Sequence, residues 1–316
     1  MKRHLGDDVV RGKIGVSRPW LGMTDLPGTR IKSMQLKEAL AKAVQQLEDA
    51  AVGSARLNAE MLLMFVLGVG RAYLYGHPER ELTRDEEDRY AEAIAERARG
   101  VPAQYIIGHQ EFWGLDFVVT PAVLIPRPET EHVVEAALEL AQGIERLRIV
   151  DVGTGSGCIA LALASELKRA EIDAVDISGD ALEIAKANAA RLQLADRVRF
   201  RSGDLLEGFG AEDFDLVVSN PPYVGECEAD KIQAEVRKFE PHVAVFGGPQ
   251  GTEIVTRLLE QAHRVLKPGG HVLVEIGFSQ SEKVRQLALD FEDVHFVEDL
   301  QGIARVLVGR KSEVRS

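Results

Sequence analysis

The stretch whose residues are best suited to chemistry is Asn220-Pro221-Pro222-Tyr223, at the end of the apolar run FDLVVSN. Two consecutive prolines cannot continue a central strand, because each lacks a backbone N–H and has a fixed φ. The residue before a proline is itself confined to extended geometry, so the Asn220 amide has a set direction. A rigid carboxamide, backbone carbonyls and an aromatic ring could hold a flat –NH2 group while its nitrogen attacks. We therefore predict catalytic roles for Asn220, Pro221 and Tyr223, and substrate contacts from these and Pro222.

A second constellation is the segment 151–157, DVGTGSG, which follows an apolar strand and opens a helix. Glycines in such a loop permit a tight turn and a close approach of the backbone to a ligand. Asp176 ends the next strand, where its carboxylate would accept from ribose hydroxyls, and Asp204 ends the third, where it could receive an adenine amino group. The predicted cofactor-binding residues are Gly153, Thr154, Gly155, Ser156, Gly157, Asp176, Asp204, Leu205 and Asn220.

The choice of cofactor depends on charge. The glycine pattern would also suit a dinucleotide, whose pyrophosphate would lie on the helix N-terminus. However, the loop contains no Lys or Arg, and acidic residues end three successive strands at the edge where ligands bind in this architecture. This arrangement favours a cationic adenosyl ligand, S-adenosylmethionine, with NAD as the alternative. The eight histidines and two cysteines show no metal-ligand spacing, so we predict no metal site.

Composition limits the classes of protein and partner. The 316 residues suffice for one large or two modest domains, and 45% hydrophobic with 28% charged residues is ordinary for a soluble protein. No apolar run reaches the roughly 18 residues of a membrane span. Two cysteines fit a reducing compartment, so we predict a cytoplasmic location without membrane partners. The net charge of -12 argues against broad nucleic-acid binding, which depends on neutralising phosphates, so no stable complex with nucleic acid is expected.

The first hundred residues divide into two segments. Residues 1–33 are basic and rich in Gly and Pro, which predicts a disordered extension. Met34 opens an amphipathic helix and is our candidate for the functional start. Further helices are predicted from Ser54, a good N-cap, and from Thr83, which begins a capping box. Residues 34–100 therefore form a predicted small helical domain.

The rest of the chain changes pattern twice. Residues 101–125 carry aromatic and β-branched residues around His109 and Gly114, which predicts a β-hairpin linker. Over 126–316, apolar strands alternate with helices at about 157–168, 180–193 and 252–266. The predicted fold class is α/β, with a doubly wound, mostly parallel, Rossmann-like sheet and a small N-terminal helical domain. The last two strands, DVHFVEDL and IARVLVGR, are expected to form an antiparallel pair.

With these features in place, the chain resembles the class I methyltransferases and, more narrowly, the PrmC (HemK) family. The similarity covers about residues 34–312. Because amino-methylases of nucleic acids share the NPPY tetrapeptide, the more specific blocks are those ahead of the glycine loop. The resemblance rests on IGHQEFWG at 107–114, LIPRPETE at 124–131, DVGTGSG, NPPYV, EPH at 240–242 and GGPQG at 247–251.

The resemblance implies methylation of the side-chain nitrogen N5 of the glutamine in the Gly-Gly-Gln motif of peptide-chain release factors. It implies that 34–100 recognises the release factor and that 126–316 is an S-adenosylmethionine-dependent methyltransferase domain. It also implies that Phe112 lines the substrate pocket, and that Arg127–Glu131 lie near the amino-acid end of the cofactor. One departure from the family pattern is the 1–33 extension, which leaves the true start in doubt.

Two other functions stay open. The first is a nucleic-acid amino-methyltransferase acting on adenine N6 or guanine N2, since a flipped base poses the same chemical problem. The second is a non-catalytic adaptor that binds the cofactor and grips a partner through its helical domain.

Overall fold

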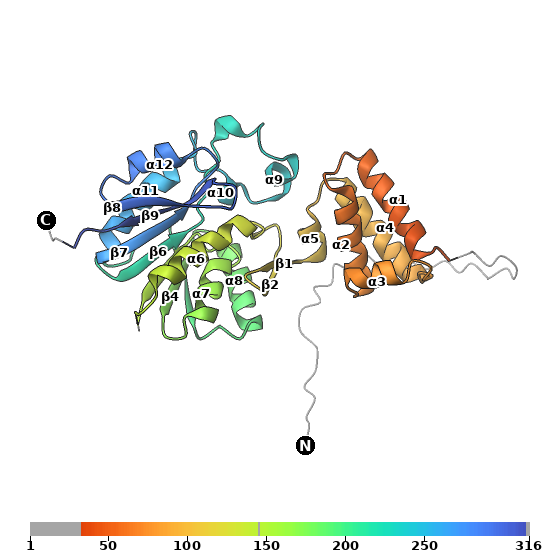
Figure 1. Ribbon diagram of the computed structural model, residues 1–316, viewed down its shortest axis with the longest axis horizontal. Helices are drawn as coiled ribbons and strands as arrows, with labels where there is room; N and C mark the ends of the chain where they lie inside the picture. The colour runs from red at the N-terminus through yellow and green to blue at the C-terminus, as the bar shows by residue number, and fades with distance from the viewer. Residues whose placement is uncertain (1–32, 145, 314–316) are drawn as a thin grey trace, which may run out of the picture. The chain divides into compact units, whose positions relative to one another are not determined.

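The computed structural model describes residues 33–144 and 146–313 (Figure 1). The predicted disordered extension over 1–33 therefore lies, except for Ser33, outside the described residues. Met34–Ser316 group into one compact unit, so the domain boundaries near residues 100 and 125 stay predictions. No helix in the described part of the chain has both the length and the apolar character needed to cross a membrane.

The N-terminal helices follow the sequence pattern closely. The capping box is confirmed: Glu86 N–H donates to Thr83 Oγ1 at 3.3 Å, and Thr83 N–H donates to Glu86 Oε2 at 2.9 Å. Ser54 precedes its helix in the left-handed region, at φ 51°, and its side chain makes no capping bond, so that detail was wrong. The helices are α1 (Leu36–Asp49), α2 (Ala55–Leu67), α3 (Arg71–Gly76), α4 (Arg84–Ala98) and α5 (Ala103–Ile107).

The predicted hairpin is confirmed as β1 (His109–Phe112) and β2 (Leu115–Val118), which pair antiparallel. Its two-residue turn has positive φ at Trp113 (55°) and Gly114 (67°). Two positive φ values in succession match the right-handed twist of the strands, and glycine makes the second one inexpensive. The chain therefore reverses sharply just ahead of the LIPRPETE segment.

The predicted α/β fold is confirmed by a seven-stranded sheet of order β5-β4-β3-β6-β7-β9-β8. Strands β3 to β7 run parallel, and β9 pairs antiparallel with both β7 and β8. The strands are β3 (Arg148–Val152), β4 (Glu171–Asp176), β5 (Val198–Ser202), β6 (Phe214–Ser219), β7 (Leu266–Glu275), β8 (Glu292–Glu298) and β9 (Ala304–Arg310).

Helices cover both faces of this sheet, as Figure 1 shows, because its strands alternate between two apolar clusters. On β3, for example, Ile149 packs with α6, α7 and α8, whereas Val150 packs with α11 and α12. The helices and 3-10 turns of this region are η1 (Pro128–Thr130), α6 (Glu131–Leu140), α7 (Cys158–Glu166), α8 (Gly179–Arg191), η2 (Glu226–Glu228), α9 (Ala234–Phe239), α10 (His242–Val245), α11 (Glu253–Val265) and α12 (Ser281–Leu287).

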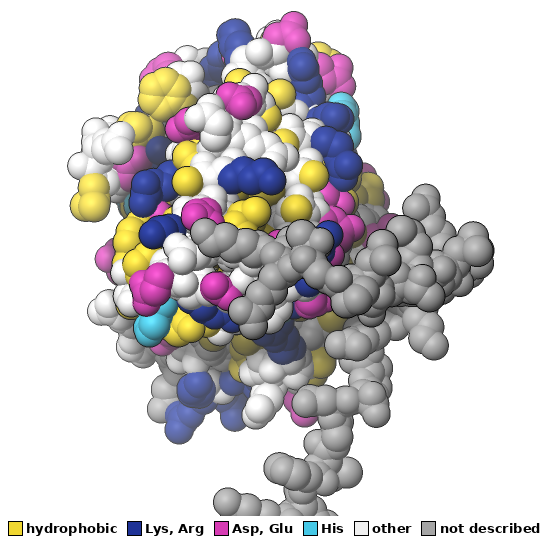
Figure 2. Space-filling model, turned by 90° about the vertical axis from the view of Figure 1, so that its right-hand side faces the viewer, with side chains coloured by type: hydrophobic (Ala, Val, Ile, Leu, Met, Phe, Trp, Pro, Cys, Tyr) yellow, Lys and Arg dark blue, Asp and Glu magenta, His cyan; other side chains and the backbone are white. Residues whose placement is uncertain are grey.

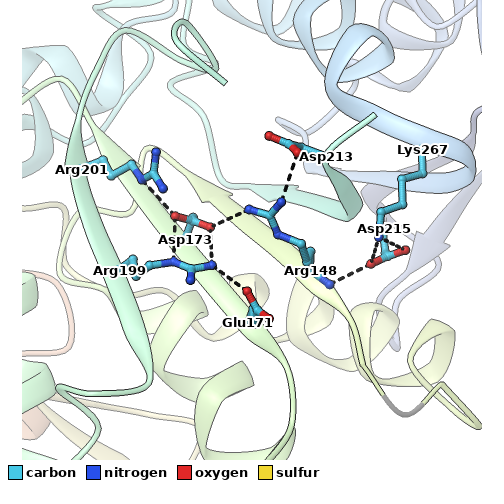
Figure 3. A network of polar contacts seen from close by, with 8 residues as sticks. All are labelled: Arg148, Glu171, Asp173, Arg199, Arg201, Asp213, Asp215 and Lys267. Atoms are coloured by element: carbon cyan, nitrogen blue, oxygen red, sulfur yellow. Dashed lines mark hydrogen bonds and ion pairs between the residues drawn. The ribbon is translucent and has the colours of Figure 1, made fainter. Parts of the chain in front are cut away.

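A network of charges ties the strands together near their amino ends (Figure 3). Its centre is Asp173 of β4, which is fully buried. Its Oδ2 lies 3.1 Å from Arg199 Nη2 and 3.7 Å from Arg148 Nη2, and its Oδ1 lies 3.0 Å from Arg201 Nε. The Arg148 backbone N–H and Lys267 Nζ donate to Asp215, both of whose oxygens are partnered, and the Arg148 side chain also pairs with Asp213. Charges on β3, β4, β5, β6 and β7 therefore balance one another at this edge.

Candidate active site

A cavity opens at the opposite edge, where the parallel strands end. The register pairs Val152 with Ser219, and Asp176 with Ser202, so the segments that follow these strands meet at one edge. Of the residues singled out from the sequence, those that line the cavity are Gly153, Thr154, Gly155, Ser156, Asp176, Asp204, Leu205, Asn220 and Pro222. Gly157, Pro221, Tyr223 and Phe112 are not among its lining residues.

The glycine loop is built from left-handed backbone, with φ of 71° at Gly153, 56° at Gly155 and 83° at Gly157. Side chains at these positions would be strained. A Cβ on Gly157 would also come within 3.1 Å of the Leu161 side chain and 3.2 Å of the Ala185 side chain. Gly157 therefore lets α7 and α8 approach closely, whereas Gly153 and Gly155 face the cavity.

Asp151, at the end of β3, supports the loop from inside. It is fully buried, and its Oδ2 accepts hydrogen bonds from Thr154 Oγ1 at 2.6 Å and from Ala160 N–H at 3.2 Å. Burial raises the pKa of this carboxyl to about 7, against the effect of those bonds. Its other oxygen, Oδ1, has no hydrogen-bond partner among the described residues.

Asp176 is the last residue of β4 and accepts a hydrogen bond from the same loop. Its Oδ2 accepts from Gly155 N–H at 2.8 Å and its Oδ1 accepts from Ser178 N–H at 2.9 Å. Burial raises the pKa of this carboxyl, although the backbone hydrogen bonds oppose that shift. Each oxygen can accept a further bond, so Asp176 can hold the loop and a ligand hydroxyl together.

Asp204 follows β5 and already has a partner. Its Oδ2 accepts from Arg257 Nη2 at 2.7 Å, and Arg257, on α11, also lines the cavity. The sequence analysis missed Arg257, which no motif marks. Asp204 Oδ1 is free of that ion pair, so the predicted contact with an adenine amino group requires this second oxygen.

A hydrogen bond to Thr130 fixes the orientation of the Asn220 carboxamide. Its Nδ2 donates to Thr130 Oγ1 at 3.0 Å, and no hydrogen bond from the described residues reaches its Oδ1. No backbone N–H in the described chain donates to the Pro221 carbonyl either. Asn220 lines the cavity whereas Pro221 does not, so Asn220 Oδ1 is an acceptor that the cavity offers to a planar –NH2 group.

The backbone after Asn220 is held by a glycine-rich loop at 247–251. A Cβ on Gly247 would lie 2.3 Å from the Pro222 carbonyl oxygen, and one on Gly251 would lie 2.4 Å from that of Tyr223. Distances this short require glycine at both positions. The GGPQG block therefore fixes the NPPY backbone through close contact.

Tyr223 turns inward from the cavity. Its hydroxyl lies 3.4 Å from Glu275 Oε1, and its carbonyl accepts from Gln280 Nε2 at 2.8 Å. Burial raises the pKa of the Tyr223 phenol. The ring is thus anchored at its polar end, and any contact with a substrate must come from its face or edge.

Phe112, which is expected to line the substrate pocket, is not among the residues that line this cavity. Only 1% of Phe112 is exposed, and its ring packs edge-on against Phe117 with centroids 6.1 Å apart. In a short strand, alternate side chains face opposite sides, and Phe112 faces the core. Phe112 therefore supports the hairpin and does not contact the cavity.

The segment 127–131 does reach the site, through Thr130. Thr130 is 1% exposed and lines the cavity beside Asn220. Arg127 forms an ion pair with the buried carboxylate of Glu240, which also accepts from Ile125 N–H at 3.4 Å. Burial raises the pKa of Glu240, and Arg127 opposes this shift. The LIPRPETE and EPH blocks are therefore one structural unit at the mouth of the cavity.

The lining fits a cationic adenosyl group better than a pyrophosphate. Two carboxylates, Asp176 and Asp204, line the cavity, and Arg257, the arginine among its described lining residues, is paired with Asp204. The buried Ser156 Oγ and Asp151 Oδ1 have no partners within the described chain. Unpaired polar groups of this kind are costly unless a ligand or water satisfies them.

Comparisons with known proteins agree with this geometry. A family model described as PrmC N-terminal domain matches residues 38–108, and one described as Methyltransferase small domain matches residues 134–238. A release factor glutamine methyltransferase of Koribacter versatilis is 58% identical over 88% of this chain and 99% of that protein. One of Moorella thermoacetica is 46% identical over 81% and 90%, respectively.

A solved structure of the hMettl16 catalytic domain in complex with MAT2A 3′UTR hairpin 6 has a TM-score of 0.51. It is 18% identical and covers 71% of this chain and 83% of the other. This likeness shows a shared fold only.

Proposed function

The chain belongs to the family of release factor glutamine methyltransferases, and we propose that it methylates the Gly-Gly-Gln glutamine of peptide-chain release factors with S-adenosylmethionine. The observation that carries this proposal is the Asn220 carboxamide, whose Nδ2 is bound by Thr130 and whose Oδ1 is left without a partner in the described chain. An unpaired, oriented acceptor at a cavity suits a substrate that brings N–H donors.

The cofactor would be held by Asp176, Asp204 and the glycine loop. When bound, S-adenosylmethionine would supply a methyl group on a sulfonium. Transfer of that methyl to the glutamine nitrogen would break the carbon–sulfur bond, leave a neutral thioether and release one proton from the nitrogen. When ionised, the carboxyl groups of Asp176 and Asp204 at the cavity wall would favour a positively charged ligand.

The residues of the site would orient the side-chain amide of the substrate glutamine. An amide nitrogen is a weak nucleophile because its lone pair is conjugated with the carbonyl. Two acceptors, Asn220 Oδ1 and the Pro221 carbonyl, would bind its two hydrogens, direct the nitrogen and return electron density to it. Positioning of this kind and preorganised electrostatics supply most of the rate enhancement where no covalent catalysis occurs.

The surface gives little support to the nucleic-acid alternative. On the face shown in Figure 2, the described basic, acidic and hydrophobic side chains are interspersed, and no broad basic stripe is visible among them. The chain also carries 50 acidic against 38 basic residues. Because phosphate neutralisation supplies most non-specific affinity, this charge balance favours a protein substrate.

Mass spectrometry of a recombinant release factor, incubated with this protein and S-adenosylmethionine, tests the proposal. We expect a gain of one methyl group on the glutamine of the Gly-Gly-Gln motif. A release factor in which that glutamine is replaced by alanine is the matched control. Transfer to RNA or DNA with no transfer to the release factor would contradict the proposal.

A further inference from the structure

Asn188 on α8 is a fully buried side chain that bonds to two other elements of the chain. Its Oδ1 accepts from Val118 N–H at 2.8 Å, and its Nδ2 donates to Val118 O at 3.1 Å and to Ser156 O at 2.9 Å. Val118 is the last residue of the hairpin strand β2, and Ser156 belongs to the glycine loop. One carboxamide therefore joins the hairpin, α8 and the loop.

The orientation of this carboxamide follows from its partners. A backbone N–H can only donate and a carbonyl oxygen can only accept, so Oδ1 must face Val118 N–H and the –NH2 group must face the two carbonyls. Both hydrogens of that group are then used. A side chain without donors at this position would leave both carbonyls unpaired, which is costly in the interior.

The Ser156 carbonyl has no partner in the backbone. The N–H four residues further on, that of Ala160, donates to Asp151 Oδ2 at 3.2 Å. No backbone N–H within the described ranges donates to Ser156 O. Ser156 lines the cavity, whereas Asn188 is not among its lining residues, so this bond reaches the loop from outside the cavity.

The packing of α8 supports the same contact. A Cβ on Gly157 would lie 3.2 Å from Ala185 Cβ, so α8 packs directly against the glycine loop. Ala185 lies three residues before Asn188 and therefore on the same face of the helix. Ala181, one turn earlier, clusters with Val123, which lines the cavity. One face of α8 thus supports both the glycine loop and the segment that follows the hairpin.

We propose that Asn188 is a positioning residue that holds the glycine loop in its cofactor-binding conformation by bonding it to the hairpin. The inference rests on the proposed function, because it concerns the cofactor of the same reaction. It also gives the hairpin a part in cofactor binding, although its Phe112 lies in the core and not at the cavity.

The loop needs such support because three glycines give its backbone wide conformational freedom. Asp176 holds the loop at Gly155, and Asn188 holds it at Ser156. A loop without the second bond would be ordered only when the ligand binds, and the cost of ordering lowers affinity. The catalytic corner, residues 220–223, makes none of these contacts, so the effect should be on cofactor affinity and not on kcat.

The first experiment is Asn188→Asp, which keeps the shape of the side chain and an acceptor for Val118 N–H but cannot donate to both carbonyls. The Kd of S-adenosylhomocysteine, measured by calorimetry, should rise about tenfold or more. The KM for S-adenosylmethionine should rise in parallel, whereas kcat at saturating cofactor should change little. A folded Asn188→Asp variant with the Kd of the wild type would overturn the inference.

Asn58 offers a matched control in the N-terminal helices. Its Nδ2 donates to Gly53 O at 3.0 Å and to Ser54 O at 3.2 Å, and its Oδ1 accepts from Arg97 Nε at 2.8 Å. Asn58→Asp therefore removes the same kind of donor bonds from a residue that does not line the cavity. It should leave the Kd of S-adenosylhomocysteine unchanged. An equal rise in both variants would overturn the inference.

The second experiment uses the wild type, so it decides the question even where Asn188→Asp does not fold. Val118 does not line the cavity, yet it shares Asn188 with the glycine loop. S-adenosylhomocysteine should therefore slow hydrogen exchange in β2 as well as in residues 151–157, measured by mass spectrometry. Exchange in α1 is the internal comparison and should not change. Slower exchange in 151–157 with no change in β2 would overturn the inference.

The inference and the proposed function can fail separately. If the wild type methylates the release factor and Asn188→Asp binds S-adenosylhomocysteine equally well, the proposed function stands and the inference does not. If the wild type binds no S-adenosylhomocysteine and transfers no methyl group, both are overturned.

Discussion

The two edges of the parallel sheet differ in how completely their buried carboxyl groups are paired. At the amino ends of the strands, the buried Asp173 meets three arginines, and both oxygens of Asp215 are partnered (Figure 3). At the carboxyl ends, Asp151 and Glu275 are each left with one oxygen that has no partner in the described chain. Burial raises the pKa of both carboxyls to about 7.

This difference separates structural charge from functional charge. A buried ion is stable when opposite charges and hydrogen bonds surround it, and costly when they do not. The carboxylates of the amino edge follow the first pattern and hold neighbouring strands together, although the buried Arg148 Nε has no partner among the described residues. The carboxyl edge keeps unsatisfied acceptors, as expected where a ligand completes the hydrogen bonding. Mutations of the residues that line the cavity should therefore change activity or ligand affinity, whereas mutations at the amino edge should change stability.

The largest expected effect is at the catalytic corner. Asn220→Ala removes the acceptor that we propose for the substrate amide and should lower kcat by about 10²–10³. The Kd of S-adenosylhomocysteine, measured by calorimetry, should change little, because other residues supply most of the cofactor contacts. Near-normal turnover in this variant would contradict the assigned role.

The amino edge should respond in stability alone. Asp173→Ala leaves three arginines without their shared carboxylate and should reduce the free energy of unfolding by about 2–3 kcal/mol, since those arginines remain partly solvated. Glu171→Ala, at the exposed rim of the same network, is the control and should cost about 0.5 kcal/mol or less. Urea unfolding measures both. Equal losses of unfolding free energy in the two variants would show that the burial of a carboxylate does not determine its contribution to stability.

At the other edge, we expect cofactor affinity to depend on Asp176. Loss of a charge-assisted hydrogen bond costs about 1.5–3 kcal/mol, so Asp176→Ala should weaken cofactor binding roughly ten- to a hundredfold. Asp180→Ala is the comparison, because Asp180 is exposed at the start of α8. Calorimetry that finds the same Kd for both variants would remove Asp176 from the site.

The smallest effect concerns the pH dependence of stability. The folded protein keeps the Asp151 proton up to about pH 7, whereas the unfolded chain loses it near 3.8, so stability falls as pH rises between these values. Asp151→Asn removes this contribution and should reduce that slope by up to about 1.4 kcal/mol per pH unit. Urea unfolding at pH 5, 6 and 7 provides the slope. A slope equal to that of the wild type would indicate that Asp151 is ionised in the folded state.

Many residues of the carboxyl edge could be predicted from the sequence, because a parallel topology brings the ends of its strands together. Asp176 and Asn220 follow apolar strands directly, and parallel strands end at one edge of the sheet. The glycine loop was recognisable for the same reason, since it lies between a strand and a helix. The capping box at Thr83 was predictable because its physics is local.

The other contacts of the site depend on packing between residues that are far apart in the sequence. Thr130 and Asn220 are 90 residues apart, and Tyr223 and Glu275 are 52 apart, so no local pattern joins them. Glu275 did leave one signal, a single carboxylate within the apolar strand HVLVEIG. The burial of Phe112 could not be predicted, because a motif does not specify which face of a four-residue strand its side chains occupy.

The most direct test of the central claim is a crystal structure with S-adenosylhomocysteine and a Gly-Gly-Gln peptide bound. We predict that the glutamine side-chain nitrogen lies about 2.7–3.2 Å from both Asn220 Oδ1 and the Pro221 carbonyl oxygen. Asn220 Nδ2 should still donate to Thr130 in that complex. A glutamine amide bound elsewhere, or an Asn220 carboxamide with its nitrogen toward the peptide, would contradict the account.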